Sequence, residues 1–270
     1  MPELPEVETL LRQLSQAVEG ARIRKVFVRD PRILNVSSKN FQHNLEGETL
    51  SRPARRGKYL CFSMKSGKEL WFHLGMTGRL LLAAECRLAH THIEISFNGR
   101  KEKLFFSDPR RFGRVVFHKG DASELPEGIR LTGLDPFQMN PDTFAGIFES
   151  RKAPIKSLLL NQRLVSGIGN IYADEGLFRA GIYPKRKGSA LSRLRLKKLH
   201  GALLGVLEEA ILCGGSTVDD YRHLNGQKGG FQTRHQVYSR GGEPCVVCGT
   251  EIKVIRLGGR STHYCPLCQK

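Results

Sequence analysis

The stretch CVVCGTEIKVIRLGGRSTHYCPLC (245–268) holds four of the seven cysteines of this 270-residue chain. Cys245 and Cys248 are separated by two residues. Cys265 and Cys268 repeat that gap sixteen residues further along. Two such pairs supply the four thiolates that tetrahedral zinc requires. Because four protein ligands complete the coordination shell, we expect one structural Zn²⁺ ion and no catalytic metal at this place.

The residues between the two cysteine pairs have the pattern of a β-hairpin. The segment EIKVIRLGGRSTHY turns at Gly258-Gly259, a dipeptide suited to a tight turn. Arg260 follows the turn, at the tip of a support that the metal makes rigid. The simplest interpretation of Arg260 is a solvated charge. Its place on a zinc ribbon in a basic chain favours a contact with phosphate.

The charge of the chain points to a polyanionic partner. Lys and Arg number 43 against 26 Asp and Glu, a formal net charge of +17. The excess is uneven, because residues 151–270 hold 20 basic and 8 acidic side chains. Such a concentration is typical of proteins that bind nucleic acid. Charge alone does not exclude a merely soluble basic protein.

Composition also indicates the compartment. There is no run of 18 apolar residues, and the acidic start has no basic-then-apolar signal segment, so we expect neither a membrane span nor export. The other cysteines, Cys61, Cys86 and Cys213, are scattered, unlike a secreted disulfide framework. We therefore expect a reducing cytoplasm, with these three as small buried hydrophobic residues.

Residues 21–131 read mostly as strands, because they hold short segments rich in β-branched and aromatic residues between polar or glycine-bearing breaks. These segments are RIRKVFVRD (22–30), KYLCFSM (58–64), ELWFHLG (69–75), HTHIEISF (90–97), KLFFSD (103–108) and RVVFHK (114–119). Their spacing predicts an antiparallel sandwich. The stretch LTGLDPFQMNPD (131–142) has two prolines and no sustained period, and reads as a linker.

From about residue 143 to residue 225 the apolar residues recur with the spacing of a helix. The expected helices are FAGIFESR (144–151), PIKSLLLNQ (154–162), IYADEGLFRAG (171–181) and a long amphipathic one at 190–215. Gly181 is placed to cap the third of them. Residues 226–236 are rich in Gly and Gln, and we expect them to be mobile.

A second signal for phosphate lies in LVSGIGNIYADEGLF (164–178). Gly167 and Gly169 permit a tight turn, and Asn170 is placed as the cap of a helix that starts at Ile171. The amide groups at a helix N-terminus attract anions. Two glycines are weak evidence by themselves, because many corners between helices look the same.

Met76, Arg110 and Phe112 lie in FHLGMTGRL and SDPRRFGRV, on expected loops between strands. An exposed Met and Phe beside an Arg is an unusual surface. Apolar side chains near arginines are what DNA-kinking proteins insert between stacked bases. The alternative is that Met76 and Phe112 fold back into the sandwich.

The N-terminal stretch MPELPEVETLL (1–11) predicts a helix. Pro5 suits a first helical turn, and the acidic residues near it suit the positive end of the helix dipole. An ordinary terminal helix explains this much. Pro2 and Glu3 lie before the helix and are left unexplained by that interpretation.

Several motifs together give these signals a common meaning. They are MPELPEVET at the start, RRGKYL around Lys58, HLGMTG, DPRRFG, GIGNIYADE, QVYSRGGEPC and the four-cysteine finger. In this order, from residue 1 to residue 268, they resemble the bacterial formamidopyrimidine-DNA glycosylase family. The related endonuclease VIII group usually has Gly where this chain has Leu4, so that branch fits less well.

The resemblance implies an α+β multidomain fold. Residues 1–131 would form an N-terminal catalytic β-sandwich with flanking helices, and 132–142 a linker. Residues 143–225 would form a helix–two-turn–helix DNA-binding domain, and 226–270 a mobile loop with a β-hairpin zinc finger of four cysteines. The stretch STVDDYRHLNGQKGGFQ (216–232) aligns with the family's lesion-capping loop.

The resemblance also implies roles for individual residues. The catalytic ones would be Pro2 as nucleophile, Glu3 as acid, Lys58, and Arg260 on the finger. The DNA contacts would come from His73, Met76, His90, Arg110, Phe112, Arg151 and Asn170. The implied partner is damaged double-stranded DNA, bound by a monomer with no membrane involved. The implied activity is excision of oxidised purines, such as 8-oxoguanine and formamidopyrimidines, followed by cleavage of the abasic site.

The expected chemistry answers the question that Pro2 and Glu3 raise. Once Met1 is removed, Pro2 becomes a rigid secondary amine that can attack the sugar C1′ and form an iminium. Glu3 can then protonate the ring oxygen. The competing hypothesis is a non-catalytic zinc-ribbon protein that binds nucleic acid. In that hypothesis neither Pro2 nor Glu3 has a function.

Overall fold

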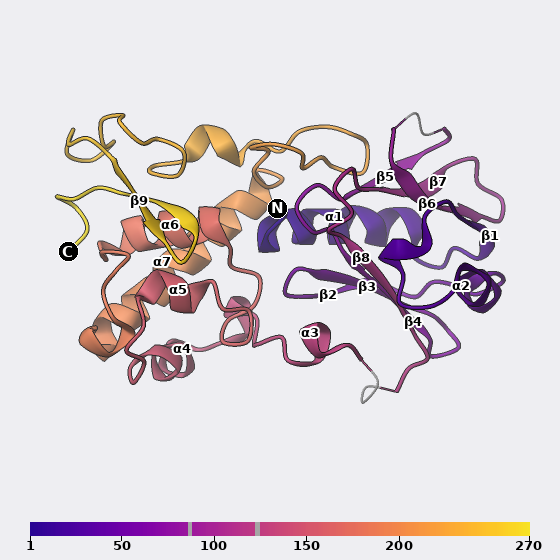
Figure 1. Cartoon of the computed structure of the whole chain (residues 1–270), viewed down its shortest axis with the longest axis horizontal. Helices are drawn as coiled ribbons and strands as arrows, with labels where there is room; N and C mark the ends of the chain where they lie inside the picture. Colours follow the sequence, from indigo (N-terminus) through magenta and orange to yellow (C-terminus); the bar gives the residue numbers. More distant parts are fainter. Residues whose placement is uncertain (86–87, 122–124) are drawn as a thin grey trace. The chain divides into compact units, whose positions relative to one another are not determined.

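The computed structural model describes residues 1–85, 88–121 and 125–270. The chain folds into two compact units. The first unit consists of Met1–Arg130 and Cys213–Gly230, and the second of Leu131–Leu212 and Phe231–Lys270 (Figure 1). The segment Cys213–Gly230 therefore follows the helices of the second unit in sequence but packs within the first.

The first unit is built on two four-stranded antiparallel sheets. One sheet has the order β1 (Ile23–Val28), β6 (Thr91–Phe97), β7 (Lys103–Ser107), β5 (Arg79–Ala83). The other has the order β2 (Ala54–Arg56), β3 (Tyr59–Ser63), β4 (Glu69–His73), β8 (Arg114–His118). Helices α1 (Leu4–Val18), α2 (Ser38–Leu45) and α3 (Glu127–Arg130) and the 3-10 turn η1 (Pro31–Ile33) complete it.

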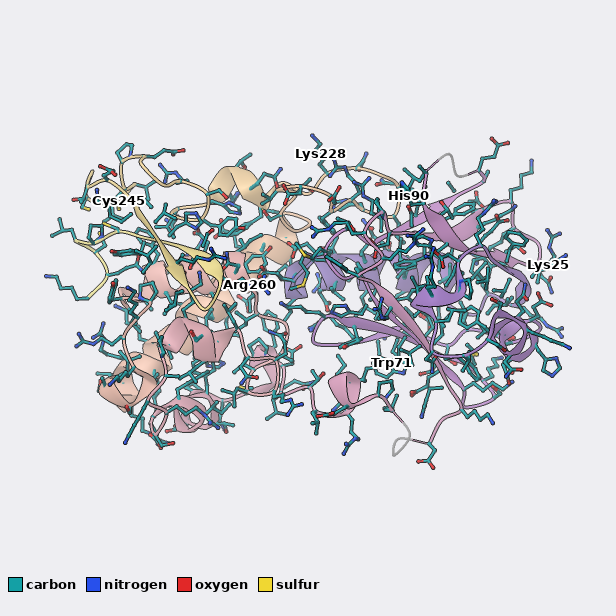
Figure 2. All side chains as sticks on the ribbon, viewed as in Figure 1. Lys25, Trp71, His90, Lys228, Cys245 and Arg260 are labelled. Atoms are coloured by element: carbon teal, nitrogen blue, oxygen red, sulfur yellow. The ribbon has the colours of Figure 1, made fainter. Side chains whose placement is uncertain are left out.

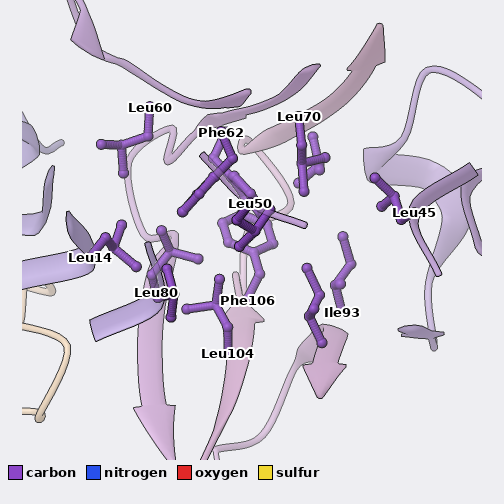
Figure 3. Close-up of a cluster of buried hydrophobic side chains, with 14 of the residues drawn as sticks. Leu14, Leu45, Leu50, Leu60, Phe62, Leu70, Leu80, Ile93, Leu104 and Phe106 are labelled. Atoms are coloured by element: carbon purple, nitrogen blue, oxygen red, sulfur yellow. The ribbon is translucent and has the colours of Figure 1, made fainter. Parts of the chain in front are cut away.

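One apolar core joins the two sheets of the first unit (Figure 3). Leu60, Phe62 and Leu70 enter it from one sheet, and Leu80, Ile93, Leu104 and Phe106 enter it from the other. Phe72 of β4 packs on Phe106 of β7 with ring centroids 5.8 Å apart. Helix α1 adds Leu14 to the same cluster. The predicted sandwich with flanking helices is confirmed.

The second unit is helical at its centre. Its helices are α4 (Pro141–Phe148), α5 (Ile155–Leu159), α6 (Asn170–Ala180) and α7 (Arg193–Leu212), with 3-10 turns η3 (Pro136–Gln138), η4 (Gly188–Ala190) and η5 (Phe231–Arg234). The hairpin of β9 (Lys253–Leu257) and β10 (Arg260–Tyr264) ends the chain. Helix α7 packs on α4 and α6 around a second apolar cluster.

Local sequence signals explain where several of these helices begin and end. Pro141 starts α4, and the side chain of Asn140 accepts a hydrogen bond from Thr143 N at 2.8 Å. Gly181 ends α6 in the left-handed conformation, as predicted. The hairpin turns at Gly258 and Gly259, also as predicted.

The elements without a counterpart in the sequence prediction include α2, β2 and β5. Strand β2 has the sequence Ala-Arg-Arg and is largely exposed, so it has no apolar alternation to detect. Within the described ranges of the chain, none of the helices is both long and apolar enough to cross a bilayer.

Candidate functional site

The N-terminus of α1 holds the two residues that sequence analysis left outside the helix. Glu3 is the N-cap of α1 and is 3% exposed, and Pro2 immediately before it is buried. The carboxylate of Glu6, at the third helical position, accepts a hydrogen bond from Glu3 N at 2.8 Å. This bond belongs to a capping box, which fixes the backbone that carries Pro2 and Glu3.

Glu6 also connects this terminus to the segment that aligns with a lesion-capping loop. Its second carboxylate oxygen accepts a hydrogen bond from Ser216 N at 2.7 Å, and its backbone carbonyl accepts one from the Tyr221 hydroxyl at 3.3 Å. Glu6 is 1% exposed. Burial, followed by the negative charge of Glu6, raises the pKa of Tyr221, which therefore stays a neutral donor.

The stem of that loop is closed by hydrogen bonds from two backbone N–H groups. Gly229 N donates to Thr217 Oγ1 at 2.9 Å, and Gly230 N donates to the carbonyl of Cys213 at 2.9 Å. A Cβ atom on Gly229 would lie 2.3 Å from the carbonyl oxygen of Gly215, so only glycine allows the two sides of the stem to approach this closely. The loop tip at 225–228 is exposed, and Lys228 lies there (Figure 2).

Lys58 and His73 are brought together by the pairing of β3 with β4. Lys58 is 6% exposed and precedes β3, where Tyr59 pairs with His73. Burial, then the positive charges of Lys58 and Arg114, lower the pKa of His73 to about 4. Its Nδ1 accepts a hydrogen bond from Gly75 N at 3.2 Å. A neutral His73 with an occupied Nδ1 presents Nε2–H as a donor, which is suited to a phosphate oxygen.

The three residues expected to fill the place of a flipped base lie on loops, as predicted. Met76 is 40% exposed and Phe112 is 49% exposed, so neither folds back into the sandwich. The guanidinium of Arg110 stands over the Phe112 ring, 4.6 Å from its centroid. His90 is exposed at the start of β6, in the left-handed conformation with φ 62° (Figure 2). These four side chains project from one unit into solvent.

The second unit presents a separate group of predicted residues. Arg260 is exposed at the start of β10, directly after the hairpin turn (Figure 2). Asn170 is half-buried, and its Nδ2 donates to the carbonyl of Ser261 at 3.0 Å, which places Asn170 beside the hairpin. Arg151 is exposed after α4, with its Nε donating to the carbonyl of Ile147 at 2.7 Å.

The predicted cap role of Asn170 is wrong. Helix α6 begins at Asn170, and Gly169 is its N-cap, with no side-chain cap bond. The Asn170 side chain donates its Nδ2 to Ser261, 91 residues away in sequence, and its Oδ1 accepts no backbone N–H as a cap would. The positive end of the α6 dipole still lies beside Asn170, so the anion-attracting feature of this corner remains.

A buried ion pair fixes the hairpin onto the helices of the second unit. Lys156 of α5 and Asp174 of α6 are both fully buried, with Nζ and Oδ1 2.6 Å apart. Lys156 Nζ also donates to the carbonyl of Ser261 at 2.9 Å, and Asp174 Oδ2 accepts from His263 N at 3.0 Å. Both partners therefore hold β10, the strand that begins at Arg260.

A second buried carboxylate explains the QVYSRGGEPC motif before the finger. Glu175 accepts hydrogen bonds from the backbone N–H groups of Gln236, Val237 and Tyr238 at 2.8–3.1 Å. Desolvation raises the pKa of Glu175, although these backbone bonds oppose the shift. One helix residue thus anchors the chain where it enters the finger.

The four finger cysteines fit a zinc ion. Their sulfur atoms all lie within 4.8 Å of one another, with Cys245 Sγ to Cys268 Sγ at 3.9 Å and Cys248 Sγ to Cys265 Sγ at 3.4 Å. A tetrahedral site with Zn–S bonds of about 2.3 Å requires S···S separations of about 3.8 Å. All four positions are protein thiols, so the ion they hold is structural.

The scattered cysteines differ from those of the finger. Cys61 is buried, and burial raises the pKa of its thiol to about 12, which makes it an inert core residue as expected. Cys213 is half-buried, less than predicted. Cys86 lies outside the described residues.

Three segments of the chain match family descriptions in the order of the motifs. Residues 1–115 match the formamidopyrimidine-DNA glycosylase N-terminal domain, 133–222 match its H2TH domain, and 242–270 match the zinc finger found in FPG and IleRS. The chain belongs to the formamidopyrimidine-DNA glycosylase family. The predicted family and fold class are confirmed.

Individual relatives of the glycosylase family cover the chain from end to end. The formamidopyrimidine-DNA glycosylase of Thermus thermophilus is 45% identical over 276 residues, covering 100% of this chain and 98% of the relative. A Lactococcus lactis Fpg variant in complex with a Fapy-dG containing DNA has a TM-score of 0.92 at 35% identity, with 100% of both chains covered. The complex of Lactococcus lactis Fpg with an abasic site containing DNA has a TM-score of 0.91 at 34% identity, with 99% of both chains covered.

Sequence reasoning missed the buried charged residues that support the candidate site. They are Glu6, Asp108, Lys156, Asp174 and Glu175, all buried. The pair Asp174-Glu175 offered a signal, because it interrupts an otherwise apolar stretch of α6. Two adjacent carboxylates on a buried helix need partners, and that need is detectable without knowing which partners they find.

Proposed function

We propose that this chain excises oxidised purines from duplex DNA with Pro2 as its nucleophile and Glu3 as its acid, and then cleaves the abasic site. Glycosylase and abasic-site lyase activity in base-excision repair follows from the family. The assignment to Pro2 and Glu3 is supported chiefly by one observation. Glu6 fixes the Glu3 backbone at the N-terminus of a buried helix, so that the residue before Glu3 is held in a defined place.

The reaction requires a free amine at Pro2. While Met1 is attached, the Pro2 nitrogen is an amide and cannot attack. Met1 is 40% exposed and therefore accessible to an aminopeptidase. After its removal, the nitrogen of Pro2 is a secondary amine with an appreciable neutral fraction near pH 7, since an ordinary α-amine has a pKa of about 8.

The bond changes then follow in sequence. The Pro2 nitrogen bonds to the sugar C1′, and the damaged base leaves with the electron pair of the glycosidic bond and takes up a proton. Glu3 protonates the ring oxygen as the sugar opens, which gives an iminium between Pro2 and C1′. The iminium acidifies the C2′ proton, so β-elimination expels the 3′ phosphate and δ-elimination the 5′ phosphate. Water hydrolyses the remaining adduct and restores the amine.

The target base must leave the helix before this chemistry can begin. Extrusion costs a few kcal/mol of stacking and pairing. We assign Met76, Arg110 and Phe112 to the space that the base vacates, because they are exposed on loops and Arg110 is stacked on Phe112. Apolar and cationic side chains in that space compensate for part of the lost stacking.

The phosphate contacts would come from both units. Lys58, His73 and His90 supply donors in the first unit, and Arg151, Asn170 and Arg260 supply them in the second. We also assign catalytic roles to Lys58, which precedes β3, and to Arg260 on the finger, as the resemblance to the family implies. Phosphate contacts position the duplex without reading its sequence, as a repair enzyme requires, since damage occurs anywhere.

The same proposal includes the oligomeric state and location of the protein, its domain boundaries and the salt dependence of DNA binding. We propose that the chain acts as a monomer in the cytoplasm, on double-stranded DNA. We also propose that its functional parts follow the boundaries 1–131, 132–142, 143–225 and 226–270. Affinity for DNA should fall steeply with salt, because bound phosphates release counterions.

Borohydride trapping tests the proposed nucleophile. Reduction during reaction with duplex carrying 8-oxoguanine opposite cytosine should give a covalent complex, with the modified residue at Pro2 by mass spectrometry. Pro2→Gly should trap more slowly, and Glu3→Gln should lose base excision by about 10²–10⁴-fold, the usual contribution of a general acid. Retention of Met1 in active protein, or wild-type trapping by Pro2→Gly, would contradict the proposal.

A further inference from the structure

Asp108 is a fully buried carboxylate in the DPRRFG motif for which the reaction has no use. Its side chain is 0% exposed and lies at the base of the loop that carries Arg110 and Phe112. Oδ2 accepts a hydrogen bond from Gly113 N at 2.7 Å, and Oδ1 accepts one from Arg110 N at 3.3 Å. The carboxylate therefore closes the loop from both ends.

The same carboxylate reaches the loop that carries Met76. The hydroxyl of Thr77 donates to Asp108 Oδ1. The two loops are also in backbone contact, because a Cβ atom on Gly75 would lie 2.6 Å from Gly113 N. Thr77 is 8% exposed while its neighbour Met76 is 40% exposed. Thr77 thus points inward to Asp108, and Met76 points outward.

The backbone of Asp108 holds a third DNA-facing segment. Asp108 N donates to the carbonyl of His90 at 3.1 Å, and the carbonyl of Asp108 lies 2.8 Å from His92 Nε2. These contacts fix the start of β6, where His90 is exposed. One buried residue is therefore bonded to the three segments that carry Met76, His90, and Arg110 with Phe112.

A second carboxylate braces the far side of the same loop. Arg111 has a φ of 55°, a conformation that residues other than glycine rarely adopt. Its Nε donates to Asp30 Oδ2 at 2.8 Å. Hydrogen bonding from Arg32, together with that from Arg111, lowers the pKa of Asp30, which keeps the brace charged. The second arginine of DPRRFG is thus held by Asp30 although it is exposed, whereas Arg110 stacks on Phe112.

We propose that Asp108, assisted by Thr77, is a positioning residue that sets Met76, His90, Arg110 and Phe112 in one rigid arrangement for base extrusion. This inference rests on the proposed function of those four residues. Loops held separately would have to be ordered on each encounter with DNA, and that ordering would cost conformational entropy. Loops that one carboxylate holds together are already ordered when they contact the duplex, so this entropy cost is avoided.

The chemistry of the carboxylate makes Asp108→Asn a direct probe. Three donors face the two oxygens of Asp108: Thr77 Oγ1, Arg110 N and Gly113 N. An amide replaces one oxygen by a donor group, so at least one of these bonds is lost. A displacement of about 1 Å in a positioned group can cost about 100-fold in rate.

The experiment compares two substrates that differ only in the need for extrusion. Asp108→Asn should lower single-turnover base excision from a duplex lesion by about 100-fold. It should change borohydride trapping on a single-stranded abasic oligonucleotide by less than about twofold, since no base remains to be extruded. Fluorescence of 2-aminopurine beside the lesion should report slowed extrusion. Glu48→Gln, which removes a charge from the pair with Lys68 away from these loops, is the matched control.

A second variant keeps the inference testable should Asp108→Asn fail to fold. Thr77→Val removes one donor and should lower excision about tenfold, whereas Thr77→Ser retains the hydroxyl and should restore it. In a Met76→Ala background, Thr77→Val should cause no further loss, because Thr77 acts through that loop.

Each outcome has a defined meaning. An unchanged excision rate in Asp108→Asn, an equal loss on both substrates, or additive effects of Thr77→Val and Met76→Ala would overturn the positioning role. Failure of the wild-type protein to trap on the single-stranded abasic substrate would instead overturn the proposed function.

Discussion

The loops of Met76 and Phe112 and the hairpin of Arg260 are held by different physical means. The loops rise from a sandwich whose apolar core joins two four-stranded sheets. The hairpin stands on a finger whose apolar cluster, among the described residues, has only five buried members, two of them cysteines. Buried charges and a metal site replace hydrophobic burial there: Lys156 with Asp174, Glu175, and four thiols.

The difference shows what each unit can tolerate. A large core can carry exposed apolar side chains on its loops, because the core alone supplies most of the stabilisation. A ribbon of fewer than about 40 residues cannot bury enough surface to do so, and small domains of this size usually need a metal. The predictions below separate these two sources of stability.

Loss of a zinc ligand should have the largest effect. Cys245→Ser should unfold the finger, because structural zinc contributes roughly 10–16 kcal/mol to the folding of such ribbons. DNA binding should be abolished while the first unit keeps its thermal transition. Zinc content and DNA affinity measure the two outcomes. Cys61→Ser is the control cysteine, and tight DNA binding by Cys245→Ser would show that the finger is dispensable.

Breaking the buried ion pair should have the next largest effect. Lys156→Met leaves the charge of Asp174 buried without its cation, which should cost roughly 3–5 kcal/mol. Adding Asp174→Asn should recover at least half of that loss, because no buried charge remains and the amide oxygen still accepts from His263 N. Denaturant unfolding followed by zinc release measures the second unit.

A surface pair provides the matched control for that experiment. Lys68→Met removes the cation of the half-exposed pair with Glu48 in the first unit and should cost less than about 1 kcal/mol. If Lys156→Met costs no more than Lys68→Met, the buried pair does not hold the hairpin.

A core truncation should affect the first unit alone. Leu60→Ala removes a fully buried side chain from the sandwich and should lower the free energy of unfolding by about 2–5 kcal/mol. Zinc release should keep its midpoint, and Leu60→Met should cost under about 1.5 kcal/mol. A shift of zinc release with Leu60→Ala would mean that the two units are not stabilised independently.

Protonation of His73 in acid should lower the free energy of unfolding of the first unit. Among these predictions, this one has the smallest expected effect. The pKa of His73 is about 4 when folded and about 6.5 when unfolded, so the unfolded state binds more protons between these values. Stability should therefore fall as pH drops from about 6.5 to about 4. The loss in free energy of unfolding between a pH of about 7.5 and a pH of about 4.5 should be smaller in His73→Gln than in the wild-type protein, by roughly 1–2 kcal/mol. Unfolding midpoints at pH values of about 7.5 and about 4.5 test it.

His235 offers the corresponding test in the second unit. Burial lowers its pKa to about 4 as well, so the same pH window applies. A His73→Gln protein should lose only the acid dependence of the first unit. Equal flattening of both transitions would contradict separate titration.

The sequence predicted the features that depend on local spacing. Two cysteine pairs, the Gly258-Gly259 turn and the loops of Met76 and Phe112 are encoded within a few neighbouring residues, and the structure contains each of them. Local patterns work here because a metal, a tight turn or an exposed loop needs only nearby residues.

The supporting carboxylates could not be predicted in the same way. Asp108 bonds to backbone N–H groups and to Thr77, 31 residues away, and backbone groups have no sequence signature. Asn170 shows the opposite error, because a residue with the right type for a cap was used for a distant contact with Ser261. Which partner a polar side chain finds is decided by tertiary packing.

The glycine contact between Gly229 and Gly215 makes the loop above it exchangeable. The bonds of Gly229 and Gly230 already hold the two ends of the loop together. Residues added at the exposed tip would therefore only lengthen the loop. Doubling such a length costs only about 0.6 kcal/mol of closure entropy. Grafts confined to the exposed tip, residues 225–228, should therefore change what the loop presents while leaving the contact of Tyr221 with Glu6 in place, which makes this tip the natural starting point for engineered excision enzymes.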